Sequence, residues 1–378
     1  MNKTLVAALV AGLFSGTAAA QIAVSANDNK QVNVAGVGQV VRDAAPDTAT
    51  ILDLGVFPPK VLGEVQAPAS VVGPPTSVAV SADERFALVA AAFKKDPADP
   101  SKTVPDNRVS VIDLKTLKVV QTVEAGAGAA GVGINPAGTL ALVANRSEGT
   151  VSVFTISGLT LKPAGKVSVG NKDSGPSTVK FIDGKRAILT RDGDHGLTML
   201  AIDGEKVTVT NRTFYGGLRP YGLDVTPDGR WAVVANIGRG QGDNDTASLI
   251  DLAANPPRVV DTVTVGPTPE GIKVSPNGKY AAVVVHNGSA SAPSSPFYNA
   301  QGKVVLLGIS NGRLLRLSEE KIGRWSQGAA FSADSNTLLV QNMVEKDIWV
   351  YKIELDQLRD TFHRIKLNGG GAAIGTAR

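Results

Sequence analysis

The stretch "ALVANRSEGTVSVF", residues 141–154, has the pattern of two short strands joined by a polar turn. Apolar residues alternate with small or polar ones on both sides of the turn, as half-buried strands require. Asn145 ends the first run, and "RSEG" forms the turn. A single hairpin does not define an architecture, so the fold depends on whether this pattern recurs along the chain.

The pattern does recur, and it includes a second hairpin each time. Similar segments begin at Ser77, Gly131, Thr178, Gly222, Gly271 and Gly328, at steps of 54, 47, 44, 49 and 57 residues. Each contains a strand, a tight turn such as "TPDG" (226–229), and a second strand. A further strand pair follows, as in "TVSVFTISGLTLKPAGKVSVG" (150–170). Four antiparallel strands in about 45 residues are typical of a propeller blade.

The two ends of the chain complete the count of blades. Residues 48–67 have the pattern of a third and a fourth strand, and "KQVNVAGVGQVV" (30–41) is the expected second strand. The missing first strand is "GAAIGTAR" (371–378) at the other end. The sequence therefore predicts an all-β, seven-bladed β-propeller of four-stranded antiparallel blades whose first blade is closed by the C-terminal strand, without an open edge. Two all-β domains are the alternative, but no linker interrupts the repeat.

These repeats resemble the YVTN-repeat β-propeller family. Its signature, an apolar residue, Val, a small residue and Asn, is matched by "LVAN" (142–145), "VVAN" (233–236), "VVHN" (284–287) and "LVQN" (339–342). The following strand of the family is matched by "RVSVID" (108–113) and "TVSV" (150–153). The second and fourth blades depart from it with "LVAA" (88–91) and "ILTR" (188–191). The family includes lactonase-like enzymes and periplasmic proteins of unassigned role, so the resemblance implies a fold and leaves the activity open.

The repeated asparagine has two interpretations. Asn145, Asn236, Asn287 and Asn342 are candidates for a polar ring around a ligand. Alternatively, an Asn at a strand end hydrogen-bonds nearby backbone and stabilises a turn. The structural interpretation is favoured, because a residue that recurs with the repeat usually serves the repeat.

The N-terminus and the composition indicate an exported protein. Lys3 precedes an apolar run, and "AAA" at 18–20 resembles a cleavage site, so residues 1–20 are the expected signal peptide and 21–378 the propeller domain. An anchor helix is the alternative, although the run is short for a membrane span. The chain has no Cys and a net charge of +4, which gives no strong nucleic-acid signal. We expect a periplasmic or secreted protein without a membrane span after signal cleavage.

Loop lengths indicate which face binds. In such blades the second-to-third and fourth-to-first connections share one face. The three long insertions, residues 93–107, 237–245 and 288–301, are all second-to-third connections. Neutral surface insertion is the alternative to a binding role. The polar residues expected at the channel mouth on this face form the candidate ligand-binding set: Arg219, Tyr221, Glu270, His286, Trp325 and Gln327. They would suit a polar or anionic small molecule, unless they are only a solvated channel mouth.

Other catalytic or metal-binding patterns are sparse. Only three histidines are present, and no zinc motif, nucleophile elbow or phosphate-binding loop occurs, so no metal and no cofactor are expected. "RDGDHG" (191–196) is either a small site or an ordinary hairpin turn. Asp243, Asn244 and Asp245 could offer oxygen ligands to Ca²⁺, but they lack the rest of a recognised calcium loop, and a solvated turn is the favoured interpretation.

Three functions remain open from the sequence. The first is a binding or scaffold propeller whose partner is a polar small molecule or a periplasmic protein. The second is a lactonase-like hydrolase in which Glu270 or His286 activates water and Arg219 stabilises negative charge. The third is electron transfer beside a redox partner. Since no haem-attachment motif occurs, any cofactor would be bound non-covalently or carried by another protein. The first is the prediction, and the second is its main alternative.

Overall fold

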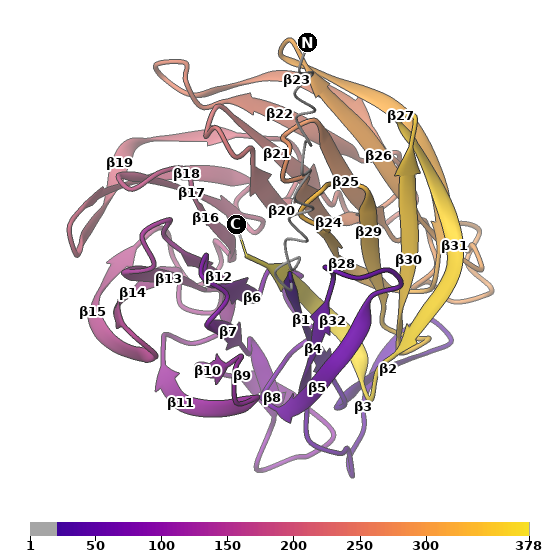
Figure 1. Cartoon of the computed structure of the whole chain (residues 1–378), viewed down its shortest axis with the longest axis horizontal. Helices are drawn as coiled ribbons and strands as arrows, with labels where there is room; N and C mark the ends of the chain where they lie inside the picture. The colour runs from indigo at the N-terminus through magenta and orange to yellow at the C-terminus, as the bar shows by residue number, and fades with distance from the viewer. Residues whose placement is uncertain (1–20, 378) are drawn as a thin grey trace, which may run out of the picture.

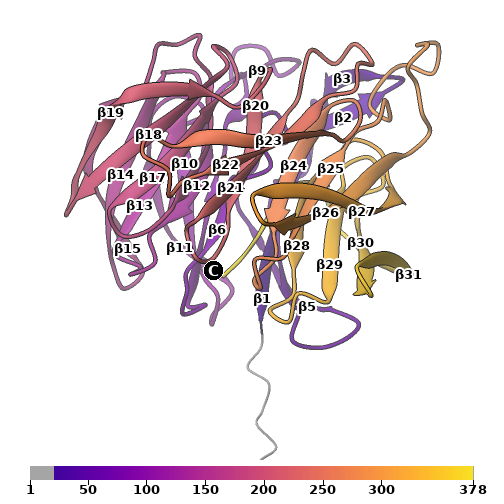
Figure 2. The same ribbon diagram turned by 90° about the horizontal axis from the view of Figure 1, so that it is seen from above.

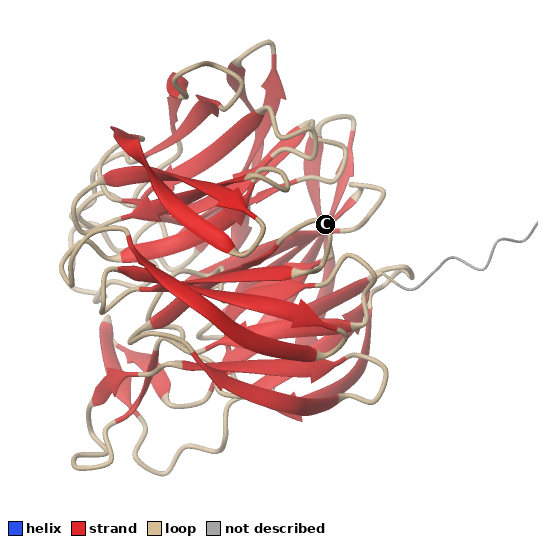
Figure 3. Ribbon diagram, turned by 90° about the vertical axis from the view of Figure 1, so that its left-hand side faces the viewer, coloured by secondary structure: helices blue, strands red, loops and turns tan. Residues whose placement is uncertain are grey.

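The computed structural model describes residues 21–377, and its ribbon consists of strands and loops only (Figure 3). Seven four-stranded antiparallel sheets surround a central axis (Figure 1). This arrangement confirms the prediction of a seven-bladed β-propeller. The expected signal peptide, residues 1–20, lies outside the described residues. Within the described part of the chain, no helix is long and apolar enough to cross a membrane.

The blades follow one another along the chain, and their strands run in order from the channel outward. Blade 1 contains β32 (Gly370–Thr376), β1 (Ile22–Asp28), β4 (Thr48–Asp53) and β5 (Lys60–Gln66). Blade 2 contains β6 (Val78–Val80), β7 (Phe86–Ala90), β10 (Arg108–Asp113) and β11 (Lys118–Glu124). Blade 3 contains β12 (Ala129–Ile134), β13 (Leu140–Asn145), β14 (Thr150–Ser157) and β15 (Thr160–Ser168). Blade 4 contains β16 (Pro176–Phe181), β17 (Arg186–Arg191), β18 (Gly196–Asp203) and β19 (Lys206–Tyr215).

The remaining three blades keep the same order. Blade 5 contains β20 (Pro220–Val225), β21 (Trp231–Asn236), β22 (Thr246–Asp251) and β23 (Arg258–Thr264). Blade 6 contains β24 (Pro269–Val274), β25 (Tyr280–Val285), β26 (Gly302–Ser310) and β27 (Arg313–Ile322). Blade 7 contains β28 (Ser326–Phe331), β29 (Thr337–Asn342), β30 (Asp347–Glu354) and β31 (Gln357–Lys366). Two small hairpins, β2 (Gln31–Val34) with β3 (Val37–Val40) and β8 (Phe93–Lys95) with β9 (Thr103–Pro105), stand outside the blades.

The C-terminal strand closes the ring, as the sequence predicts. β32 is the innermost strand of blade 1 and pairs antiparallel with β1, with Ala23 opposite Thr376. The predicted second strand of this blade is wrong, however. β1 fills that place, and residues 30–41 contain the β2–β3 hairpin instead. The reason lies in burial: every residue of β1 is buried, whereas the hairpin turns at Ala35 and Gly36, both with positive φ, and is largely exposed.

The core is divided among the interfaces between blades. In the described residues, each adjacent pair of blades shares a cluster of buried apolar side chains, which makes seven such clusters around the ring. Alternate residues of one strand serve both neighbours: Ala141 and Val143 pack toward blade 2, and Leu140 and Leu142 toward blade 4. Because both faces of a middle strand are buried, these strands are apolar throughout rather than alternating.

The glycine that begins several repeats has a packing explanation. A Cβ added at Gly131, Gly222 or Gly271 would lie within 2.4 Å of a carbonyl oxygen in the next blade. Real Cβ atoms do not approach other atoms so closely. Inner strands of neighbouring blades therefore meet at these positions only because glycine lacks a side chain.

Four long second-to-third connections lie on one face of the ring. Figure 2 shows the β2–β3 hairpin and β9 at the upper edge of the ring when it is seen from the side. The connections span residues 29–47, 91–107, 237–245 and 286–301. The sequence did not reveal the connection at residues 29–47 as a long loop, because the alternating residues of its hairpin have the pattern of a blade strand. We call these four connections the collar.

Candidate functional site

The segments of the collar touch one another in order around part of the ring. Asn33 Nδ2 of blade 1 donates to Ala290 O of blade 6 over 3.0 Å, across the intervening blade 7. A Cβ added at Gly242 of blade 5 would lie 2.2 Å from the Phe297 ring of blade 6. Lys95 Nζ of blade 2 donates to Arg42 O of blade 1 over 2.8 Å. The collar is thus continuous over blades 5, 6, 7, 1 and 2.

Blades 3 and 4 have short second-to-third turns, so the collar is interrupted above them. The residue that directly follows the second strand lies at this gap, and it is Arg146 in blade 3 and Asp192 in blade 4. His286 holds the equivalent position in blade 6. The backbone amides of Arg146, Asp192 and His286 each donate to the carbonyl oxygen of the residue just before the inner strand of their own blade. Each of these side chains enters the channel mouth from a rigid strand end, which fixes its position.

Asp192 is the centre of an ionic network at the mouth. Arg146 Nη2 and Arg219 Nη2 each donate to Asp192 Oδ2 over 3.0 Å, and Ser177 Oγ donates to Asp192 Oδ1 over 2.7 Å. The Asp192 side chain is 3% exposed. Burial raises the pKa of this carboxyl, but Arg146, Ser177 and Arg219 outweigh burial and hold the pKa below its usual range. Asp192 is therefore ionised and holds both guanidinium groups in place.

Tyr221 lies beneath this network. The Arg146 guanidinium carbon is 5.4 Å from the centre of the Tyr221 ring, within the range of a cation–π contact. Burial raises the pKa of the Tyr221 hydroxyl far above its ordinary value, so it remains protonated. The aromatic face thus supports the cation and is not free to stack on a ligand.

Glu270 and His286 form a pair beside the network. His286 Nε2 lies 2.6 Å from Glu270 Oε2 and 3.0 Å from the carbonyl oxygen of Ser326. Both neighbours of Nε2 are acceptors, so this nitrogen carries the proton and Nδ1 is the nitrogen left for water or ligand. Glu270 is near enough to contribute to the pKa of Arg146 and of Tyr221. The pair and the network therefore belong to one electrostatic site.

Trp325 and Gln327, the other two predicted site residues, lie on the blade 7 side of the mouth. Trp325 packs against Val71 and Met343. Gln327 is fully buried, and its Nε2 donates to Trp325 O over 3.4 Å, while within residues 21–377 its Oε1 has no hydrogen-bond partner. The structure thus brings Arg219, Tyr221, Glu270 and His286 together. Trp325 and Gln327 stand on either side of Ser326, whose carbonyl oxygen lies 3.0 Å from His286 Nε2. Ligand binding by any of the six remains a prediction.

Sequence reasoning did not select Arg146 or Ser177, and it considered Asp192 only as part of "RDGDHG". An alignment of the residues that directly follow each second strand could have found Arg146 and Asp192. The match "VVHN" (284–287) hid this alignment, because it is two residues out of register with "LVAN" (142–145). In the structure Val285 occupies the place of Asn145, and Asn287 lies two residues beyond it. "RDGDHG" is not one site either. Asp192 faces Arg146, whereas Asp194 pairs with Arg191 over 3.1 Å at the turn.

The other acidic turn has a structural role. Asp245 Oδ2 accepts a hydrogen bond from the Thr268 amide over 2.9 Å. Burial raises the pKa of this carboxyl above its ordinary value. Among residues 21–377, no group of three or more His, Cys, Asp and Glu side chains is arranged to hold a metal ion.

Comparisons with known proteins support the fold. No protein-family model and no curated protein sequence matches the chain. A Bacteroides fragilis protein, named a "putative 6-phosphogluconolactonase", shares 18% identity at a TM-score of 0.70, covering 96% of this chain and 99% of that one. The Pseudomonas aeruginosa periplasmic gluconolactonase shares 15% identity at a TM-score of 0.67, covering 95% and 99%. Hydrazine synthase of Kuenenia stuttgartiensis shares 19% identity at a TM-score of 0.62, covering 82% and 91%. At these identities the likeness concerns the fold alone.

Proposed function

We propose that this chain is an exported propeller of the YVTN-repeat type that binds a small polar molecule at the channel mouth, on the face that carries the collar. Residues 1–20 direct it to the periplasm or out of the cell. The Pseudomonas relative in fold, named a periplasmic protein, is consistent with that location. Binding of a periplasmic protein at the same face is the alternative partner.

One observation carries the proposal. The fixed Arg146–Asp192–Arg219 network and the Glu270–His286 pair lie together at the channel mouth, between the gap above blades 3 and 4 and the collar of blades 5 and 6. Two guanidinium groups, two carboxylates and one imidazole nitrogen offer both donors and acceptors to a ligand. A hydroxylated carboxylic acid matches this set, because its carboxylate meets an arginine while its hydroxyl groups meet the acidic side chains. We therefore take gluconate as the probe.

Isothermal titration calorimetry with gluconate tests the proposal. We expect wild-type binding with a Kd below about 1 mM. Arg219→Asn should weaken it at least about tenfold, because a donor is lost, while Asn tolerates the positive φ of this position. The control Arg359→Asn, on exposed β31, should bind like wild type. No heat of binding, or an equal effect of the two variants, contradicts the proposal.

Lactone hydrolysis is a second candidate, favoured by the 2.6 Å contact between Glu270 and His286. The carboxylate would orient the imidazole, and Nδ1 would take a proton from water as the water oxygen attacks the acyl carbon. The ring C–O bond then breaks, the ring oxygen takes the proton from Nδ1 and becomes an alcohol, and a hydroxy acid remains. Arg219 would stabilise the negative charge on the acyl oxygen.

Proton release from glucono-δ-lactone at constant pH separates this candidate from binding alone. A hydrolase should exceed the spontaneous rate, and Glu270→Gln or His286→Gln should each lower the catalysed rate about 100-fold. Arg359→Asn should keep full activity. A wild-type rate equal to the spontaneous rate would exclude hydrolysis of this lactone and leave the binding function.

A further inference from the structure

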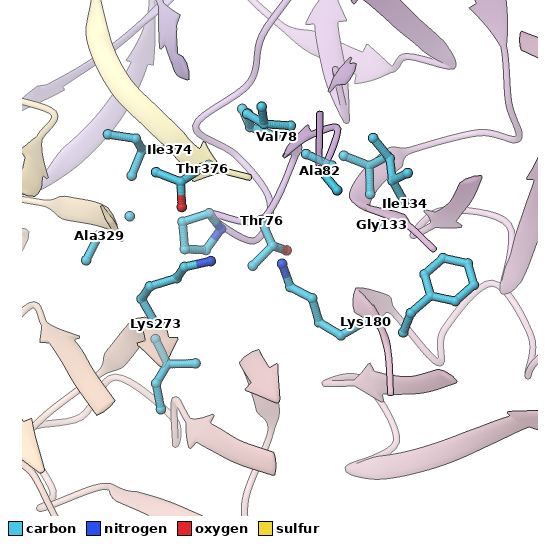
Figure 4. A pocket seen from close by; sticks show the side chains of 18 of the residues that line it. Thr76, Val78, Ala82, Gly133, Ile134, Lys180, Lys273, Ala329, Ile374 and Thr376 are labelled. Carbon is cyan, nitrogen blue, oxygen red and sulfur yellow. The ribbon is translucent and has the colours of Figure 1, made fainter. Parts of the chain in front are cut away.

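The central channel contains a cavity of about 320 Å³ at the end opposite to the collar. It lies among the inner strands, on the face of the tight first-to-second turns, and Figure 4 shows it at close range. About half of its wall is apolar, and this part includes Val78, Ile134, Phe181, Ile272 and Ile374. Water beside these side chains makes few hydrogen bonds, so an apolar ligand group gains by replacing it there.

Two lysines interrupt the apolar wall. Lys180 of β16 and Lys273 of β24 occupy equivalent places in their inner strands, and Figure 4 shows both amino groups directed toward the middle of the cavity. Lys273 Nζ lies 3.5 Å from Asp224 Oδ2, and that oxygen also accepts a hydrogen bond from the Val274 amide over 3.0 Å. Asp224 thus pairs with Lys273 at the edge of the cavity.

The charged residues of this cavity differ from those of the mouth. Within residues 21–377, Lys180 and Lys273 are the only charged residues in its lining, and Asp224 adjoins it. Glu84 lies in a neighbouring recess, where its Oε1 accepts a hydrogen bond from the Ile22 amide over 3.0 Å. The two ammonium groups of the lining outnumber Asp224, the carboxylate that adjoins it, in a space whose wall is about half apolar. Net charge is costly in such surroundings, so a single negative charge would be stabilised there.

Hydroxyl groups complete the polar part of the cavity. Thr76 and Thr376 belong to its lining, and Figure 4 shows their side chains beside the two amino groups. Thr76 Oγ1 lies 3.0 Å from Thr178 Oγ1, so blades 2 and 4 meet beside Gly131 of the intervening blade 3. Lys273 lies three residues beyond Glu270 on β24, which corresponds to about 10 Å along a strand. The lining reaches Gly271, next to Glu270, but the two lysines lie deeper in the channel than the site at the mouth.

We propose that this cavity binds a small organic monocarboxylate with an apolar body. The carboxylate would lie between the two ammonium groups and accept hydrogen bonds from them, and the body would pack on the apolar wall. The volume, at the lower end of ligand pockets, suits a compact aromatic or branched acid. This site does not depend on the proposed function of the mouth.

Titration calorimetry with benzoate and with benzamide tests the assignment. Benzoate should bind the wild-type chain, and benzamide, which has the same shape without the charge, should bind at least about tenfold more weakly. Lys180→Met and Lys273→Met should each weaken benzoate binding about tenfold or more. The control Lys279→Met removes a lysine from an exposed turn of blade 6 and should leave benzoate binding unchanged.

Two further measurements keep the test decisive. A thermal melt of each variant shows whether it is folded, and if either lysine-to-Met variant is not, Lys180→Gln and Lys273→Gln replace the pair. Arg219→Asn should leave benzoate binding intact, so a failure of the mouth site and a failure of this site give different results. Absence of benzoate binding by the wild-type chain, equal binding of benzamide, or insensitivity to both lysine substitutions would overturn the assignment.

Discussion

A buried asparagine connects two strands and a loop in several blades. Asn145 Nδ2 donates to Thr150 Oγ1 over 2.8 Å and to Ser152 Oγ over 2.9 Å, and its Oδ1 accepts from the Gly126 amide over 2.9 Å. Asn236 bonds Thr246 and Ser248 in the same way. The Asn of one strand and the Thr-x-Ser of the next are thus one unit. The structural interpretation of the repeated Asn holds at these positions.

Replacement of this asparagine should therefore affect stability. We expect Asn145→Ala to lower the free energy of unfolding by about 1–3 kcal/mol, because buried donors and acceptors lose their partner. Urea unfolding followed by tryptophan fluorescence measures this. The control is Asn287→Gly, which keeps the positive φ and should change stability by less than about 1 kcal/mol. Equal losses at both positions would show that Asn287 also serves the repeat.

The collar lies outside the four-stranded blades that the sequence repeat forms. Its β2–β3 hairpin pairs only with itself and contacts a distant segment, the 286–301 connection, through Asn33 and Gly36. The two ends of the hairpin are already joined, since the Val41 amide donates to Lys30 O over 2.8 Å. Because the connections of the collar contact one another, they have a defined conformation on the rigid blades.

Removal of the hairpin tests whether it braces its neighbour. Residues 31–40 can be replaced by Asn-Gly, which favours a tight turn between Lys30 and Val41. We expect amide hydrogen exchange in residues 286–301 to become several-fold faster, while peptides from blade 4 keep their wild-type rates. Unchanged exchange in 286–301 would show that this connection holds its conformation without the hairpin.

At the scale of the whole molecule, the ring joins the two ends of the chain and leaves a channel with two different openings. One opening carries the collar, the ionic network and the Glu270–His286 pair. The other carries the cavity with Lys180 and Lys273. Each blade has the same four-stranded arrangement, so the difference arises from the long connections of the collar and from a few side chains at equivalent positions. In a repeat protein of this kind, the repeated residues specify the fold, and the residues that differ between repeats specify the binding sites.

The sequence by itself determined the repeat, the number of blades and the closure by the C-terminal strand, because alternation and tight turns are local properties of the chain. It also placed Arg219, Tyr221, Glu270 and His286 at one mouth. Only the tertiary structure decided that β1 and not residues 30–41 completes blade 1, since that choice depends on burial against blades 2 and 7.

The tertiary structure also decided which charges meet. Arg146 and Asp192 are 46 residues apart and pair because two blade ends converge on the axis. Lys180 and Lys273 likewise face one cavity from two blades. Sequence periodicity shows that such positions are equivalent, but electrostatic contact depends on distance in space, and only the closed ring sets that distance.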